Sequence, residues 1–238
     1  MAKVLAIVQA RMSSTRLPGK SLADVGGEPM LSLLLRRLQR SRKMDGLVIA
    51  TSIDPSDDSI EETARKLGCR VYRGDRNDVL ARFVGAADGH PGPIMRITAD
   101  CPLVDPTIAD EVIDLFLSNP ECDYASNIEP RTYPDGLDVE VVSHELLERI
   151  AAAVDDPSDR EHVTSAIRRD LERLRSVSLV REEDLGDLRW TVDTSDDLDF
   201  VRQVVARLGR RRYAAGMNEI LAAIKNEPSL AAYHGRRG

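Results

Sequence analysis

The sequence is poor in aromatic residues and in cysteine, and each shortage excludes a class of protein. Phe, Trp and Tyr make up 4% of the 238 residues, which argues against a binder of single-stranded nucleic acid that stacks bases on aromatic rings. The three cysteines, Cys69, Cys101 and Cys122, are odd in number and lack the spacing of metal ligands. This pattern indicates reduced thiols rather than a disulfide framework or a zinc site.

The sequence also lacks a long apolar run and an excess of basic residues. No stretch approaches the roughly 20 apolar residues that span a bilayer, and the run Val4–Val8 is too short for a secretory signal and is soon followed by Arg11. Lys and Arg total 33 against 40 Asp and Glu, a formal net charge of −7. We therefore predict a cytoplasmic protein without membrane or nucleic-acid partners, in which any phosphate site is local.

Short apolar runs alternate with amphipathic segments, which is the pattern of βαβ units and a mostly parallel sheet. The length suits one α/β domain, 1–238. Apolar runs predict strands at 4–9, 46–51, 69–72 and 94–98, and a strand-like segment at 188–194. Apolar residues three or four positions apart predict helices at 30–40, 59–67, 79–87, 108–118 and 196–208.

The segment 123–170 departs from this alternation. It contains a short apolar run, the turn-rich EPRTYPDG, the alternating LDVEVVS and two helical stretches, and we interpret it as an inserted antiparallel arm with helices. Residues two apart on a strand share a face, so Asp138 and Glu140 are expected on one side of it, away from the core.

The segment that directly follows the first strand predicts a phosphate-binding loop. It reads QARMSSTRLPGK and places Arg11, Arg16 and Lys20 beyond the carboxyl end of a strand, where open α/β sheets bind ligands. Three cations and nearby hydroxyl groups suit a polyphosphate. On residue types alone, a basic surface loop with ordinary salt bridges is an equal alternative.

Two better-known phosphate motifs do not fit this loop. The string GKS resembles the end of a P-loop, but that motif needs a glycine where this chain has Ser14. No G-x-G-x-x-G follows the strand either, so a dinucleotide fingerprint is absent.

Several ordered motifs carry a more specific resemblance. The loop QARMSSTRLPGK is followed by RGDRNDVLAR, RITADCPLVDP, YPDGLDVEV, REHVT and WTVDTSDDL. This series resembles the CMP-sugar synthetases, meaning the acylneuraminate and 3-deoxy-manno-octulosonate cytidylyltransferases, and most of all their branch of spore-coat polysaccharide biosynthesis protein F. The resemblance runs from residue 3 to about residue 205.

The resemblance implies a GT-A-like, Rossmann-like sheet flanked by helices and a Mg²⁺-dependent transfer of CMP from CTP to a sugar, sugar acid or sugar phosphate. Pyrophosphate is released, and the product serves polysaccharide or glycoconjugate synthesis. The resemblance also implies a homodimer in which the region 123–170 covers the acceptor and pairs the subunits. Whether a hydroxyl or a phosphate of the acceptor attacks stays open, as do the general base and the acceptor itself.

The resemblance assigns roles on the nucleotide side residue by residue. Asp100, after the run IMRIT, and Asp193, in WTVDT, are implied as the Mg²⁺ ligands, although a role near the start of the following helix is an alternative for Asp193. The catalytic set is Arg11, Arg16, Lys20 and Asp100. The nucleotide-binding set is Ala6, Gln9, Ala10, Arg11, Ser14, Arg16, Lys20, Arg73, Gly74 and Asn77, of which the last three also suit a plain strand-to-helix turn.

The implied acceptor-binding residues lie in the second half of the chain. They are Tyr133, Asp135, Asp138, Glu140, Arg160 and His162. A solvated hairpin face is the alternative for the acidic residues, and a structural role is the alternative for a histidine near a helix start. Relatives commonly have Pro-Tyr where this chain has Ser165 and Ala166, which leaves the acceptor open.

Two other functions remain at this stage. A glycosyltransferase could use the same type of sheet, but such enzymes generally show a D-x-D motif, whereas Cys101 and Pro102 follow Asp100. A nucleotide-binding protein without catalysis is the second alternative. Cys101 has no histidine near it in sequence, so we interpret it as a packing residue rather than a nucleophile.

Overall fold

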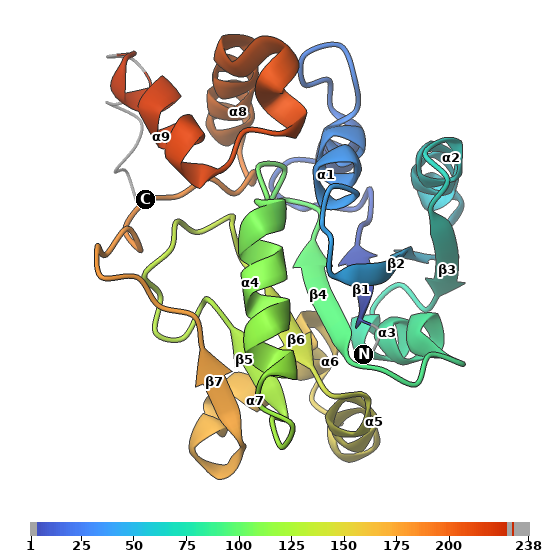
Figure 1. Ribbon diagram of the computed structural model, residues 1–238. Helices are drawn as coiled ribbons and strands as arrows, with labels where there is room; N and C mark the ends of the chain where they lie inside the picture. Colours follow the sequence, from blue (N-terminus) through green and yellow to red (C-terminus); the bar gives the residue numbers. More distant parts are fainter. Residues whose placement is uncertain (1–3, 228–229, 231–238) are drawn as a thin grey trace.

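The computed structural model describes residues 4–227 and 230, and in this part of the chain seven strands form one mixed sheet between helices (Figure 1). The strand order is β3-β2-β1-β4-β6-β5-β7. Four parallel strands make up one half, namely β1 (Val4–Gln9), β2 (Met44–Ser52), β3 (Arg70–Gly74) and β4 (Ile94–Thr98). The other half contains β5 (Tyr124–Ser126), β6 (Glu140–Val142) and β7 (Ser176–Ser178), with β6 antiparallel to both β4 and β5.

Both faces of the sheet are covered, as the alternation of β1 shows. Val4, Ala6 and Val8 pack into one core cluster, while Leu5 and Ile7 pack into the other. The first face carries α1 (Met30–Leu38), α2 (Asp58–Lys66), α4 (Pro106–Leu117), α8 (Ser195–Leu208) and α9 (Met217–Lys225). The second carries α3 (Val79–Ala87), α5 (His144–Ala153) and α7 (Ser165–Arg169), with α6 (Pro157–His162) beside α3.

Smaller elements complete the described chain. Short 3-10 turns lie at Lys20–Leu22, Pro55–Asp57, Leu171–Arg173 and Gly209–Tyr213. Among residues 4–227 and 230, no helix combines the length and the apolar character that crossing a membrane requires.

The α/β class and the first four strand–helix units agree with the sequence prediction, but the predicted strand at 188–194 is wrong. This stretch forms only an isolated bridge between Asp135 and Arg189. Its backbone groups bond elsewhere: Val192 N donates to Asp100 O over 2.9 Å, and Asp193 N donates to the Asp197 carboxylate over 2.8 Å. A turn and a helix start therefore use the groups that a strand partner would need.

The expectation for the face of Glu140 is also wrong. β6 lies inside the main sheet between β4 and β5, so the pair β5–β6 extends that sheet. Glu140 is 1% exposed. Its carboxylate is in contact with the Arg96 guanidinium and accepts a 2.6 Å hydrogen bond from Tyr124 Oη. A buried acidic residue with such partners produces the same alternating pattern as an exposed one.

Candidate nucleotide-binding site

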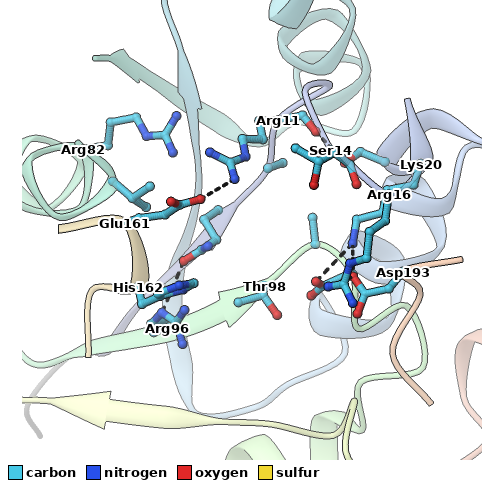
Figure 2. A pocket seen from close by; sticks show the side chains of 17 residues that line it. Arg11, Ser14, Arg16, Lys20, Arg82, Arg96, Thr98, Glu161, His162 and Asp193 are labelled. Carbon is cyan, nitrogen blue, oxygen red and sulfur yellow. Dashed lines mark hydrogen bonds and ion pairs between the residues drawn. The ribbon is translucent and has the colours of Figure 1, made fainter. Parts of the chain in front are cut away.

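A cleft of about 350 Å³ opens where β1 and β4 end (Figure 2). Gln9 and Thr98 are register partners at the ends of these strands, so the residues that follow them meet at one edge of the sheet. The lining residues come from the loop after β1, from α3, β4 and α6, and from the segment before α8. They are Gln9, Ala10, Arg11, Ser14, Thr15, Arg16, Lys20, Ser21, Val79, Arg82, Arg96, Thr98, Ala99, Asp100, Glu161, His162 and Asp193.

The loop after β1 is held by its own backbone and by one buried carboxylate. Gly19 adopts φ 77°, a conformation that favours glycine, and donates from its N to Met12 O over 2.9 Å. Met12 N donates to the Asp57 carboxylate over 2.7 Å, and Asp57 is 1% exposed. Ser21 Oγ donates to Arg11 O over 3.1 Å. These contacts close the loop and turn its cations toward the cleft.

Lys20 lies between two carboxylates. Its Nζ is 3.2 Å from Asp100 Oδ2 and 2.9 Å from Asp193 Oδ1, and it donates to Val192 O over 2.6 Å. Arg16 reaches the same Asp193 oxygen over 2.9 Å. The Lys20 side chain is 12% exposed, so it is held in place by its partners. The Arg16 side chain is 65% exposed, so it reaches Asp193 from the solvent side of the cleft.

The segment before α8 holds Asp193 in position. Arg189 binds the second Asp193 oxygen over 2.7 Å and the Asp197 carboxylate over 2.5 Å. Asp197 also accepts from the backbone N of Asp193 and of Thr194, both over 2.8 Å. Thr194, and not Asp193, is the N-cap of α8. The Asp193 carboxylate therefore faces the cleft rather than capping the helix.

The donor set of these two carboxylates fits Mg²⁺. Burial acts to raise the pKa of Asp100, but the Lys20 ammonium and hydrogen bonds with Thr98 and Lys20 outweigh it and hold the pKa below its usual value. Magnesium prefers hard oxygen ligands and is commonly bound by one or two carboxylates together with substrate phosphates. In residues 4–227 and 230 there is no cluster of three or more metal-ligating side chains, so such an ion would need ligand oxygens as well.

The opposite end of the cleft contains three arginines in different states of pairing. Arg96 is in contact with the Gln9 amide, over 3.2 Å, and with Glu140. Burial acts to raise the pKa of Glu140, but the Arg96 charge lowers it below its usual value. Arg11 forms a 2.5 Å ion pair with Glu161 of α6, which joins the two walls of the cleft (Figure 2).

Arg82 of α3 is the third arginine, and the residue is 2% exposed. Its Nε and Nη1 atoms have no hydrogen-bond partner among the residues that the structure describes. Burial, and then the nearby charge of Arg11, lower the pKa of Arg82.

The cleft brings together most of the residues predicted for the donor side but not all of them. Gln9, Ala10, Arg11, Ser14, Arg16, Lys20, Asp100 and Asp193 line it. Ala6 is instead fully buried in the core. Arg73 and Gly74 are the last residues of β3 rather than turn residues, and Arg73 is engaged in ion pairs with Asp58 and Glu61. Asn77 is not among the lining residues.

Of the residues predicted for the acceptor, only His162 lines the cleft. Tyr133 lines a second cavity, where Arg181 lies 5.7 Å from its ring centre. Asp138 forms two 2.7 Å hydrogen bonds with Arg131, and burial raises the pKa of Asp135. Arg160 pairs with Asp78 over 2.7 Å, and Glu140 is buried beneath Arg96.

Three charged lining residues were not among the predicted site residues, although two of them left a signal in the sequence. Arg96 interrupts the apolar strand IMRIT with a charge, and Arg82 follows Val79 by one helical turn in RNDVLAR. Glu161 stands beside His162 in REHVT, and nothing in the sequence pairs it with Arg11.

An α/β sheet whose parallel strands end at a cluster of cations and carboxylates is characteristic of a nucleotidyltransferase. The sequence matches the family model described as cytidylyltransferase over residues 5–210. The chain therefore belongs to the cytidylyltransferase family, whose members transfer a cytidylyl group from CTP. The predicted family and the predicted enzyme class are confirmed.

Individual relatives agree with this assignment. The spore coat polysaccharide biosynthesis protein SpsF of Bacillus subtilis (strain 168) is 35% identical, with 97% of this chain and 98% of that protein aligned. A solved cytidylyltransferase from Leptospira borgpetersenii serovar Hardjo-bovis (strain JB197) superposes with a TM-score of 0.92 at 33% identity, and 97% of each chain is covered. A 3-deoxy-manno-octulosonate cytidylyltransferase of Geobacter sulfurreducens is 35% identical across 49% of this chain and 46% of its own length.

Proposed function

We propose that this cytidylyltransferase transfers CMP from CTP to an acidic sugar or sugar phosphate in a Mg²⁺-dependent reaction that serves polysaccharide synthesis. The observation that supports it most is the convergence of Asp100 and Asp193 on Lys20 at the carboxyl edge of the sheet. The names of two relatives, a polysaccharide biosynthesis protein and a 3-deoxy-manno-octulosonate cytidylyltransferase, support the class of acceptor.

On this proposal, the loop residues bind the triphosphate. Lys20 supplies a charge close to the reacting phosphate, and Arg16 donates to the outer oxygens. Arg11, which is paired with Glu161, donates to the nucleotide from the other wall of the cleft. Asp100 and Asp193 hold Mg²⁺. The bound ion neutralises negative charge that develops on the phosphates during transfer.

The reaction forms a bond between an acceptor oxygen and the α-phosphorus of CTP and breaks the bond between that phosphorus and the oxygen shared with the β-phosphate. Pyrophosphate leaves with the electron pair. A phosphate oxygen of the acceptor attacks as the anion that it already is, whereas a hydroxyl group has to lose its proton to a base.

The proposal also covers the domain organisation, the cellular location, the oligomeric state and the acceptor-binding residues. The chain acts as one GT-A-like domain over 1–238 in the cytoplasm, and it works as a homodimer in which region 123–170 covers the acceptor. We assign the acceptor to Tyr133, Asp135, Asp138, Arg160 and His162 on family resemblance, of which His162 lines the cleft.

Pyrophosphate release tests the proposal. Purified protein is incubated with CTP, MgCl₂ and a panel of acidic sugars, neutral sugars and sugar phosphates, and pyrophosphate is measured against reactions without acceptor, without Mg²⁺ or with UTP. We expect pyrophosphate to be released only when CTP, Mg²⁺ and one particular acidic acceptor are all present. Transfer of a sugar from a preformed nucleotide sugar without pyrophosphate, or equal rates with UTP, would contradict it.

A further inference from the structure

Arg82 is a buried cation without a counter-ion in the described part of the chain. The residue is 2% exposed, and neither Nε nor Nη1 has a hydrogen-bond partner there. A buried charge is unfavourable unless an opposite charge and hydrogen bonds compensate it. Arginine cannot avoid this cost by releasing its proton at neutral pH. The side chain lines the cleft, so a ligand can provide the missing partner.

The neighbouring charges do not provide it. Arg11 is close enough to repel Arg82, and the Glu161 carboxylate is engaged by Arg11. The Glu140 carboxylate does not provide it either, since it is bound to the Arg96 guanidinium.

Three carboxylates attract Arg82 from further away, and each has other partners. Asp57 accepts hydrogen bonds from Met12 N and Ser52. Asp75 accepts from the backbone N of Asn77 and Asp78. Asp78 caps α3 and pairs with Arg160. None of them forms an ion pair with Arg82.

Around Lys20 and Asp193, the positive and negative side chains are equal in number. There Arg16, Lys20 and Arg189 face three carboxylates, those of Asp100, Asp193 and Asp197. Figure 2 places Arg82 on the opposite side of the cleft from Lys20 and Asp193. A triphosphate bound at Lys20 therefore leaves Arg82 for a second anionic group.

We infer that Arg82 binds the carboxylate or phosphate group of the acceptor. The planar guanidinium group can donate two parallel hydrogen bonds to either group. The inference rests on the proposed function for the identity of the two substrates. Val79, one helical turn earlier on the same wall, provides an apolar contact beside the charge.

Thermal unfolding without ligands is the first test. Replacing an uncompensated buried charge with an apolar side chain of similar length should stabilise the protein, so Arg82→Met should raise Tm by about 2–4 °C. Arg76→Met is the matched control, because Arg76 lies on the adjoining loop, its side chain is 53% exposed and it pairs with Asp54 over 3.5 Å. We expect no shift for the control.

Inorganic phosphate is the anion probe in the second test, which uses protein saturated with CTP and Mg²⁺. Millimolar phosphate should raise Tm of the wild type and of Arg76→Met, and sodium chloride at equal ionic strength should not. The phosphate-dependent shift should be lost in Arg82→Met, whereas the CTP dissociation constant measured by calorimetry should change by less than about threefold.

Other outcomes overturn the inference in different ways. A large loss of CTP affinity in Arg82→Met, with no added effect of phosphate on CTP-loaded wild type, would assign Arg82 to the triphosphate. Reduced discrimination between CTP and UTP would assign it to the base. A lower Tm without ligand and an unchanged phosphate response would make Arg82 structural. Failure of the wild type to bind CTP at all would count against the proposed function instead.

Discussion

Among single residues, Asp193 receives the largest number of charged contacts in the cleft, from Lys20, Arg16 and Arg189. Its backbone N is bound by Asp197 at the start of α8. A carboxylate so placed can hold a metal ion against a phosphate while its position is fixed by groups that do not react.

If Asp193 holds Mg²⁺ as proposed, Asp193→Asn should lower the rate of CTP-dependent pyrophosphate release by about 100-fold or more, because the amide lacks the negative charge that would bind the ion. Asp196→Asn is the matched control, since Asp196 is exposed two positions after Thr194. Circular dichroism should show both variants folded. A rate for Asp193→Asn within a few-fold of the control would disprove its assignment as a metal ligand.

Glu140→Gln should be strongly destabilising, because it leaves the Arg96 guanidinium, whose side chain is 12% exposed, without its buried carboxylate. Removing one partner of a buried ion pair costs about 3–5 kcal/mol, and we expect a loss of this size in the free energy of unfolding measured with urea. Glu182→Gln, at an exposed position, should change it by less than about 0.5 kcal/mol. A small effect of Glu140→Gln would mean that Arg96 finds solvent or another acceptor.

Some roles of single residues could be predicted from the sequence, and others could not. Lys20, Asp100 and Asp193 were predictable, because each follows an apolar run or stands in a motif that resembles the family. Glu140 was assigned to an exposed face, because alternation reports which residues share a face and not whether a buried partner such as Arg96 neutralises a charge. The Nε and Nη1 atoms of Arg82 have no hydrogen-bond partner in the described chain, a property that only packing reveals.

At the scale of elements, α6 is the short helix that brings Glu161 and His162 to the cleft. Asp159 of the same helix is 6% exposed and is bound by Arg169 and Ser165 of α7. Between the two helices Val163 adopts φ 59°, which is unusual for a β-branched residue. The Asp159–Arg169 ion pair therefore joins α6 to α7 on either side of the strained residue Val163.

Hydrogen bonds from Arg169 and Ser165 lower the pKa of Asp159 from 3.8 to about 2. A carboxyl group whose pKa is depressed by folding stabilises the fold above its ordinary pKa and loses that contribution as the pH falls toward the folded value. Arg169→Met should therefore destabilise the protein at pH 7, but only modestly, since the Arg169 side chain is 63% exposed and solvent screens the ion pair. The difference from wild type should shrink as the pH falls from about 4 toward 2.

Urea unfolding at several pH values measures this effect, with Arg173→Met as the control because Arg173 is 82% exposed. A difference between wild type and Arg169→Met that stays constant across this pH range would mean that the Asp159–Arg169 pair does not act through its charge.

Element boundaries were predictable in the first half of the chain and poorly predictable in the second. β1, β4 and α3 have the predicted limits, because each carries a long apolar pattern with clear ends. The strands β5, β6 and β7 contain three residues each, too few for a period to be read. The run at 188–194 is as apolar as a strand, but the hydrogen bonds of Asp100 and Asp197 keep it out of the sheet.

At the scale of the whole molecule, the cleft joins both halves of the sheet. The loop after β1 comes from the parallel half, and α6 comes from the segment after β6 that follows the change to antiparallel pairing. A ligand that binds in this cleft would contact both halves of the sheet and should therefore stabilise the entire fold.

Saturating CTP with Mg²⁺, at about 100 times the dissociation constant, should stabilise the native state by about 2.7 kcal/mol. For a domain of this size, Tm should rise by about 5–10 °C. UTP at the same concentration should raise it much less, and a thermal-shift assay measures both. Equal shifts with UTP and CTP would remove the claim of cytidine specificity from the proposed function.

The position of Lys20 between Asp100 and Asp193 makes metal and nucleotide depend on one another. Mg²⁺ alone would approach an ammonium group, and CTP alone would approach two carboxylates. With both ligands bound, the carboxylates of Asp100 and Asp193 would face the ion and the Lys20 ammonium group would face the phosphates. Each ligand should therefore raise the affinity for the other by the same factor, and the protein should take up magnesium and CTP together rather than in either order.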